Sequence, residues 1–196
     1  MAAGIAATVA ISRPATLAEL VLAVGVGGVG AVISDIDIGS SESHKDADKV
    51  IAMTTITMIG IGVLDYFFSL GIWNKMTSNR TVYQMLIAML AFIGICVYGK
   101  EQPHRSFMHS FLAMILLSAI IAVIYPGAVI YFVIGFLSHL VLDIFNYKKV
   151  RLFYPLKKGI CFRIFHARGM ANDIIFIIGV IVAVTEVILL VWQKFQ

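Results

Sequence analysis

The sequence predicts an all-α fold, a polytopic transmembrane helical bundle, and three observations support this prediction. Of the 196 residues, 60% are hydrophobic and only 13% are charged, and the mean hydropathy is +0.95. A soluble domain with so much apolar surface would aggregate, so the composition is that of an integral membrane protein. The apolar residues form runs of roughly 17–23 residues, which suits a hydrocarbon core of ~30 Å. Continuous runs favour a helical bundle over a barrel.

About six spanning helices are expected, preceded by a short apolar helix. In chain order, the short helix is Ala2–Ile11 and the spans are Leu17–Ile33, Val50–Trp73, Val82–Tyr98, Phe107–Ile124, Gly127–Phe145 and Ile174–Trp192. The first helix is too short to cross a membrane by itself. The N-terminus lacks the basic start and the cleavage site of a secretory signal, so we expect nothing to be removed. Residues 1–196 are therefore treated as one integral membrane domain, in which 146–173 is a basic, partly interfacial cytoplasmic segment.

The distribution of Lys and Arg predicts the orientation of the bundle. Six spans place the loops 34–49, 99–106 and 146–173 on one side of the membrane. Eleven of the 15 Lys and Arg residues lie on that side, and the positive-inside rule assigns it to the cytoplasm. Seven of those eleven belong to 146–173 alone, so they carry less weight on topology if that segment binds substrate.

Three polar clusters interrupt the apolar background: SDID at 34–37, HRSFMHS at 104–110 and SHLVLD at 138–143. All three lie at the cytoplasmic ends of predicted spans. His139 and Asp143 are four residues apart and share one helix face, and His109 opens its predicted span at the same depth. Burying carboxylates and imidazoles in hydrocarbon is costly unless something compensates. A divalent cation bound among them would offset that cost.

The residue types indicate which metal is expected. Carboxylate oxygens combined with imidazole nitrogens suit Zn²⁺, Mn²⁺ or Fe²⁺ better than Ca²⁺ or Mg²⁺, with Zn²⁺ the first choice. The expected ligands are Asp35, Asp37, His104, His109, His139 and Asp143. This set exceeds the three or four ligands of one catalytic zinc, so it predicts either two ions or one ion whose histidines are oriented by the remaining carboxylates.

Each cluster alone also has an ordinary interpretation. His139 and Asp143 could form a hydrogen-bonded pair between packed helices. The SDID cluster could be a helix end that meets water, and HRSFMHS could be a polar loop. The convergence of all three at one depth favours the metal site, because ionisable residues within a membrane are usually functional.

These elements, in this order, resemble the YdjM-like family, which is described as LexA-binding, inner-membrane-associated, metal-dependent hydrolases. The resemblance rests on Asp35-Ile36-Asp37, on His104-Arg105 with His109-Ser110, on Ser138-His139 with Asp143, and on Tyr154-Pro155-Leu156. It covers about residues 25–160 and implies a multi-pass protein of the bacterial inner membrane. It also implies hydrolysis by a metal-activated water. On that interpretation Asp35 or Asp143 acts as general base, and Arg105 grips an anionic oxygen.

The segment after the fifth predicted span interleaves basic and apolar residues. Such a mixture suits a segment that lies on the anionic headgroups of membrane lipids, and a plain positive-inside anchor would look similar. The sharper hypothesis is a lid that grips the phosphate of a phospholipid or polyprenyl phosphate. The expected substrate- or anion-binding residues are Arg105, Lys148, Lys149, Arg151, Tyr154, Lys157 and Lys158. No nucleic-acid-binding module is recognisable.

Three functions are compatible with these patterns. The first is a hydrolase of a phosphoester or lipid-like substrate at the cytoplasmic membrane interface. The second is a metal-ion transporter, which would use the same ligand types. Ligands gathered at one end of the bundle favour the hydrolase, because transporters tend to bind near the membrane midplane. The third is a non-catalytic adaptor that binds a protein partner through its basic loop, as the LexA-binding description implies.

Overall fold

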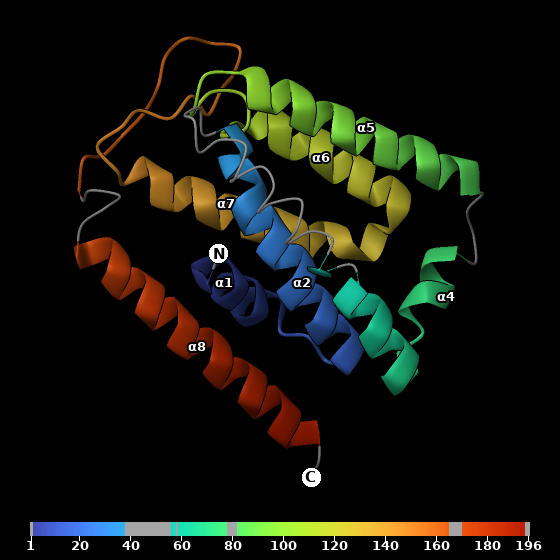
Figure 1. Ribbon diagram of the computed structural model, residues 1–196. Helices are drawn as coiled ribbons and strands as arrows, with labels where there is room; N and C mark the ends of the chain where they lie inside the picture. Colours follow the sequence, from blue (N-terminus) through green and yellow to red (C-terminus); the bar gives the residue numbers. More distant parts are fainter. Residues whose placement is uncertain (1, 38–55, 58, 78–81, 165–169, 195–196) are drawn as a thin grey trace.

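The computed structural model describes residues 2–37, 56–57, 59–77, 82–164 and 170–194, and over these ranges the fold is all-helical (Figure 1). The α-helices are α1 (Ala2–Ser12), α2 (Leu17–Ile33), α4 (Ile72–Thr77), α5 (Val82–Glu101), α6 (Phe111–Ile124), α7 (Val129–Ile144) and α8 (Met170–Lys194). Two short 3-10 helices, η1 (Ser34–Asp37) and η2 (Pro126–Ala128), and a helical segment at Ile59–Phe68 complete the described elements. The predicted all-helical class is confirmed for these residues.

Two of the described helices are long and apolar enough to cross a membrane, Leu17–Ile36 and Pro126–Ile144. They coincide with the first and fifth predicted spans. The third and sixth predicted spans lie within α5 and α8, whereas the fourth is shortened because α6 begins only at Phe111. The described helices therefore establish two candidate spans rather than six.

The predicted span Val50–Trp73, part of which lies outside the described residues, is not one continuous helix. The helical segment Ile59–Phe68 ends shortly before Gly71, which has a φ of 70°. Glycine adopts this left-handed conformation without steric cost. The carboxylate of Asp65 then accepts a hydrogen bond of 2.8 Å from the N–H of Ile72. That bond satisfies one of the amides left open at the start of α4.

The core is built on α2 and α7, which pack closely against each other. Glycines bring the two backbones into direct contact. A Cβ atom on Gly30 would overlap the carbonyl oxygen of Phe132, and one on Gly135 would overlap the carbonyl oxygen of Gly27. Small residues allow this approach of helices in membrane proteins. The close packing holds together the C-terminal ends of two helices that carry predicted ligands.

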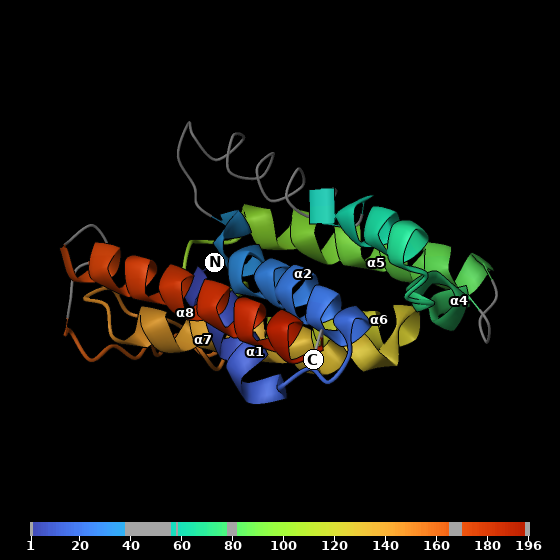
Figure 2. The ribbon, with the colours of Figure 1, turned by 90° about the horizontal axis from the view of Figure 1, so that it is seen from below.

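The short helix α1 forms a hairpin with α2 and packs against α2, α7 and α8 (Figure 2). A capping arrangement starts α2: Thr16 Oγ1 accepts a hydrogen bond of 3.1 Å from the N–H of Glu19. The Glu19 carboxylate in turn accepts one of 2.7 Å from the N–H of Ala15. Such reciprocal bonds satisfy amides that a helix start leaves open. They fix the turn between α1 and α2.

The segments that carry the three polar clusters meet at one end of the molecule, beside residues 146–164 (Figure 1). We call residues 146–164 the basic hairpin. An antiparallel bridge closes it, with two N–H···O bonds of 2.9 Å between Val150 and Ile160. The N–H of Phe162 donates to the carbonyl of Ile144 at 2.7 Å, which returns the chain to the end of α7.

Candidate metal centre

Four side chains from three elements converge at this end of the bundle. Oδ1 of Asp35 lies 3.6 Å from Nε2 of His109 and 3.4 Å from Nε2 of His139. Oδ2 of Asp143 lies 3.0 Å and 3.7 Å from the same two nitrogens. Asp35, His109 and His139 offer ligand atoms that all lie within 4.8 Å of one another. We call these three residues the ligand trio.

Asp35 is positioned by the 3-10 turn η1, which continues α2. Its neighbours Ile33 and Ile36 are buried in the hydrophobic core. Because these two isoleucines anchor the turn from the inside, the carboxylate between them is held at the site. The Asp35 side chain remains 39% exposed, which leaves the centre open on that side.

His109 lies in the turn just before α6, and its side chain is fully buried. The hydroxyl of Ser110 accepts a hydrogen bond of 3.2 Å from the N–H of Ala113, which caps α6. The same hydroxyl donates to the carbonyl of Phe107 at 2.6 Å. The helix therefore begins one residue after Ser110, and not at Phe107 as expected. The cap and the buried residues before it fix the His109 ring.

Asp143 is held by Arg105, whose side chain is only 8% exposed. Nη2 of Arg105 donates to Oδ1 of Asp143 at 2.9 Å, and Nη1 donates to the carbonyl of Lys148 at 2.8 Å. The backbone at Arg105 has a φ of 63°, and its carbonyl accepts a bond of 3.0 Å from the N–H of Arg151. The guanidinium thus joins α7 to the basic hairpin, and its expected contact with a substrate oxygen stays a prediction.

Of the remaining expected ligands, Asp143 lies beside the trio and His104 lies at its edge. His104 is exposed, and its ring centroid lies 5.1 Å from that of His109. Its ring therefore borders the centre without joining the trio. The side chain of Asp37 lies outside the part of the chain that the structure describes.

Apart from Arg105, the expected anion-binding residues lie on the basic hairpin, where their exposure differs. Lys148, Lys149, Lys157 and Lys158 are exposed, and Arg151 is half-buried. Tyr154 packs against the ring of Phe107, and its hydroxyl is 3.0 Å from the hydroxyl of Tyr98. The N–H of Phe111, the first residue of α6, donates to the carbonyl of Leu152 at 2.9 Å. The hairpin is therefore fastened to α5 and α6 while its lysines face outwards.

Over residues 1–195 the chain matches the profile of the family described as YdjM inner membrane protein. The chain belongs to this family. Its name places the protein at an inner membrane and states no activity. No curated protein and no solved structure matches.

The geometry fits one divalent cation in this YdjM-family protein. Zinc bonds to nitrogen and oxygen are ~2.0–2.1 Å, so two ligand atoms of a tetrahedral site lie about 3.3 Å apart. The distances from Asp35 to the two histidines, 3.4 and 3.6 Å, are close to this value. Nε2 of His139 and Oδ2 of Asp143 are buried, and their polar neighbours are atoms of the same centre: Nε2 of His139 lies 3.4 Å from Oδ1 of Asp35, and Oδ2 of Asp143 lies 3.0 Å from Nε2 of His109. Buried polar atoms need partners, and a divalent cation bound among these side chains would supply one.

The structural roles of Ser110 and Arg105 in the site were not predicted from the sequence. A Ser directly before an apolar run is a helix-start signal, and Ser110 would have placed the beginning of α6 correctly. The bond between Arg105 and Asp143 has no such signal, because 38 residues separate the partners. Only the fold brings them together.

Proposed function

We propose that this protein is a membrane-embedded, metal-dependent hydrolase that acts on a phosphoester or lipid-like substrate at the cytoplasmic membrane interface. The observation that carries the proposal is the ligand trio, two imidazoles and one carboxylate with an exposed side at Asp35. Catalytic zinc sites have three protein ligands and keep one position open, whereas structural sites are closed. Zn²⁺ is the first choice of ion, with Mn²⁺ or Fe²⁺ as alternatives.

A divalent cation bound by the trio would supply a Lewis acid and make a bound water more acidic. Asp143 is the proposed general base, because Oδ2 is buried beside His109 while Oδ1 is held by Arg105. As the water oxygen bonds to phosphorus, its proton passes to Oδ2 of Asp143. The bond to the leaving alkoxide breaks, and Asp143 returns the proton to that alkoxide.

The position and composition of the basic hairpin are evidence that the substrate is anionic and lies at a membrane surface. The bond from Arg105 to the carbonyl of Lys148 places the start of the hairpin directly beside Asp143. The hairpin exposes apolar side chains between its lysines, among them Phe153, Leu156 and Phe162. Cations mixed with exposed apolar groups suit anionic headgroups. A phospholipid phosphate held there would approach the open side of the centre.

The proposal includes a six-span topology with the metal centre on the cytoplasmic side. Beyond the two candidate spans, α5 has 20 residues and α8 has 25, which at 1.5 Å per residue correspond to about 30 Å or more. The excess of Lys and Arg on the side of the basic hairpin supports the orientation.

Hydrolysis is tested with purified protein in mixed micelles of detergent and phosphatidic acid, and with a soluble phosphodiester. We expect turnover that a chelator abolishes and Zn²⁺ restores. Asp143→Asn should retain bound metal and lose about a hundredfold or more of the turnover, the typical contribution of a general base. Glu186→Gln on α8, a carboxylate outside the centre, is the control and should keep full activity.

One outcome would overturn the proposal that the protein is a hydrolase. If protein with bound metal shows no turnover on these substrates and instead carries the metal into liposomes, the centre belongs to a transporter.

A further inference from the structure

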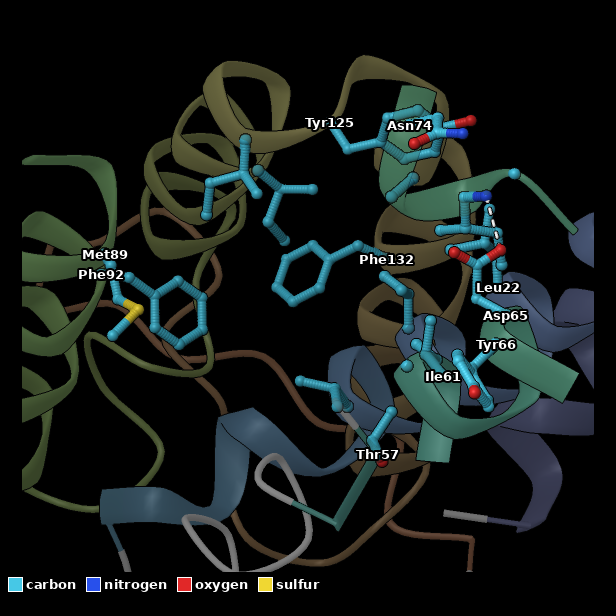
Figure 3. A pocket seen from close by; sticks show the side chains of 18 of the residues that line it. Leu22, Thr57, Ile61, Asp65, Tyr66, Asn74, Met89, Phe92, Tyr125 and Phe132 are labelled. Carbon is cyan, nitrogen blue, oxygen red and sulfur yellow. Dashed lines mark hydrogen bonds between the residues drawn. The ribbon is translucent and has the colours of Figure 1, made fainter. Parts of the chain in front are cut away.

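A cavity of about 630 Å³ lies between α2, α5, α6 and the helical segment Ile59–Phe68 (Figure 3). Ligand pockets in proteins typically measure ~300–1,000 Å³. The ring of Phe132 projects into the middle of the cavity (Figure 3). Met89 and Phe92 of α5 line one side, and Ile61 lines the opposite side (Figure 3). The cavity has the size of a binding site.

This cavity is separate from the metal centre. Its lining on α7 includes Phe132, seven residues before His139, which is about 10 Å along the helix. The fully buried side chains of Phe136 and Leu117 pack in the hydrophobic core together with Phe132. No ligand of the trio lines the cavity. A molecule bound here would therefore not contact the metal.

The chemistry of the lining points to an apolar ligand with a small polar end. Most of the lining side chains are aliphatic or aromatic. Asp65 lies on the side opposite Met89 and Phe92 (Figure 3), and Asn74 also lines the cavity. Asp65 already accepts the hydrogen bond from Ile72 that starts α4. The polar groups thus border a cavity that is otherwise hydrocarbon-like.

The elements on both sides of the cavity present apolar faces. The exposed large hydrophobic residues include Ile59, Val63, Leu64 and Phe67 on the helical segment and Ile87, Met89, Leu90 and Ile93 on α5. In a protein of the inner membrane, such faces meet the hydrocarbon of the bilayer. Lipids are therefore the molecules that could enter the cavity between these two faces.

We propose that this cavity binds the hydrocarbon chain of a membrane lipid, with the polar end of the lipid near Asp65 and Asn74. An empty apolar cavity leaves its lining atoms without dispersion contacts on one side. A lipid chain would restore those contacts and support α5 and α6 against the helical segment. This site does not depend on hydrolysis at the metal centre.

Two glycines of the helical segment give a matched test. Among the residues that the structure describes, a Cβ on Gly62 or on Gly60 would meet nothing within 4 Å, and of these two glycines only Gly62 lines the cavity. Gly62→Phe should therefore fill the cavity, whereas Gly60→Phe adds the same side chain elsewhere on the segment. A second matched pair lies on α5. Met89 lines the cavity, so Met89→Trp is the test variant, and Leu90 does not line it, so Leu90→Trp is the control.

The readout is native mass spectrometry of delipidated protein titrated with dioleoyl phosphatidylethanolamine. We expect one lipid to bind wild-type protein and both controls, and to bind Gly62→Phe and Met89→Trp about tenfold more weakly, a loss of roughly 1.4 kcal/mol. Equal binding by all five proteins would overturn the proposal, as would equal loss in the variants and their controls. A protein dimer that the cavity-filling variants disrupt would also overturn it, because the occupant would then be a second chain.

Discussion

Arg105 joins three parts of the site through one side chain and one carbonyl group. Its guanidinium contacts Asp143 and the carbonyl of Lys148, and its own carbonyl accepts the N–H of Arg151. The substrate contact expected of this arginine stays a prediction, and the fold gives it a further role, which is to orient the proposed base. An arginine suits this role because its planar fork can donate to two acceptors at once.

We predict that Arg105→Met destabilises the protein by about 3 kcal/mol, because it leaves the buried Asp143 without its cation. Arg105→Lys should recover part of this loss, since one ammonium group keeps the charge but not the two-pronged geometry. The measurement is thermal denaturation followed by circular dichroism. A melting curve for Arg105→Met that superimposes on that of wild-type protein would contradict the assigned role.

The sequence predicted which polar residues gather at this end of the bundle better than it predicted their local geometry. Asp35, His109 and His139 could be grouped because they share one depth at the ends of predicted spans. Their distances could not be predicted, since these depend on how three separate elements pack. The placement of His104 outside the trio depends on a turn in which Arg105 takes a left-handed conformation, and no pattern in the sequence indicates that turn.

At the scale of the elements, apolar runs predicted where most helices lie and missed where two of them break. The expected range of α2 agrees with the observed one, and α5, α7 and α8 overlap their predicted spans. The break at Gly71 depends on the left-handed backbone of that glycine and on the hydrogen bond from Ile72 to Asp65. The late start of α6 depends on the hydrogen bond from Ala113 to Ser110. Hydropathy averaged over a long window is insensitive to such local features.

The contact between α2 and α7 determines whether Asp35 and His139 can share one ion. We predict that Gly135→Ala destabilises the protein by about 1–3 kcal/mol, the usual cost of forcing a group into a packed interface. The added Cβ would press on the carbonyl of Gly27, so the ends of the two helices should separate and bound metal should decrease. Denaturation midpoints and metal content are measured on the same preparations.

Gly94→Ala on α5 is the matched control for this change. A Cβ there meets no atom of the described residues within 4 Å, and alanine favours helix over glycine by roughly 1 kcal/mol. This variant should therefore keep its metal and be as stable as wild-type protein or slightly more stable. If both glycine variants behave alike, the α2–α7 contact is not what aligns the centre.

At the scale of the whole molecule, the basic hairpin is expected to face the cytoplasm. The chain has two cysteines: Cys161 lies in the hairpin and is partly exposed, whereas Cys96 is buried in α5. We predict that a membrane-impermeant maleimide labels Cys161 in inverted membrane vesicles and not in spheroplasts. Cys161→Ser should abolish labelling in both. Labelling of Cys161 in spheroplasts would place the hairpin and the metal centre on the opposite side.

The central claim is that one end of this bundle holds a divalent cation through Asp35, His109 and His139. The most direct measurement is the metal content of purified protein by inductively coupled plasma mass spectrometry. We predict about one transition-metal ion per chain in wild-type protein, most of it lost in His139→Ala and retained in His104→Ala, because only His139 belongs to the ligand trio. Folded wild-type protein that binds no transition metal, or that keeps its metal in His139→Ala, would contradict the claim.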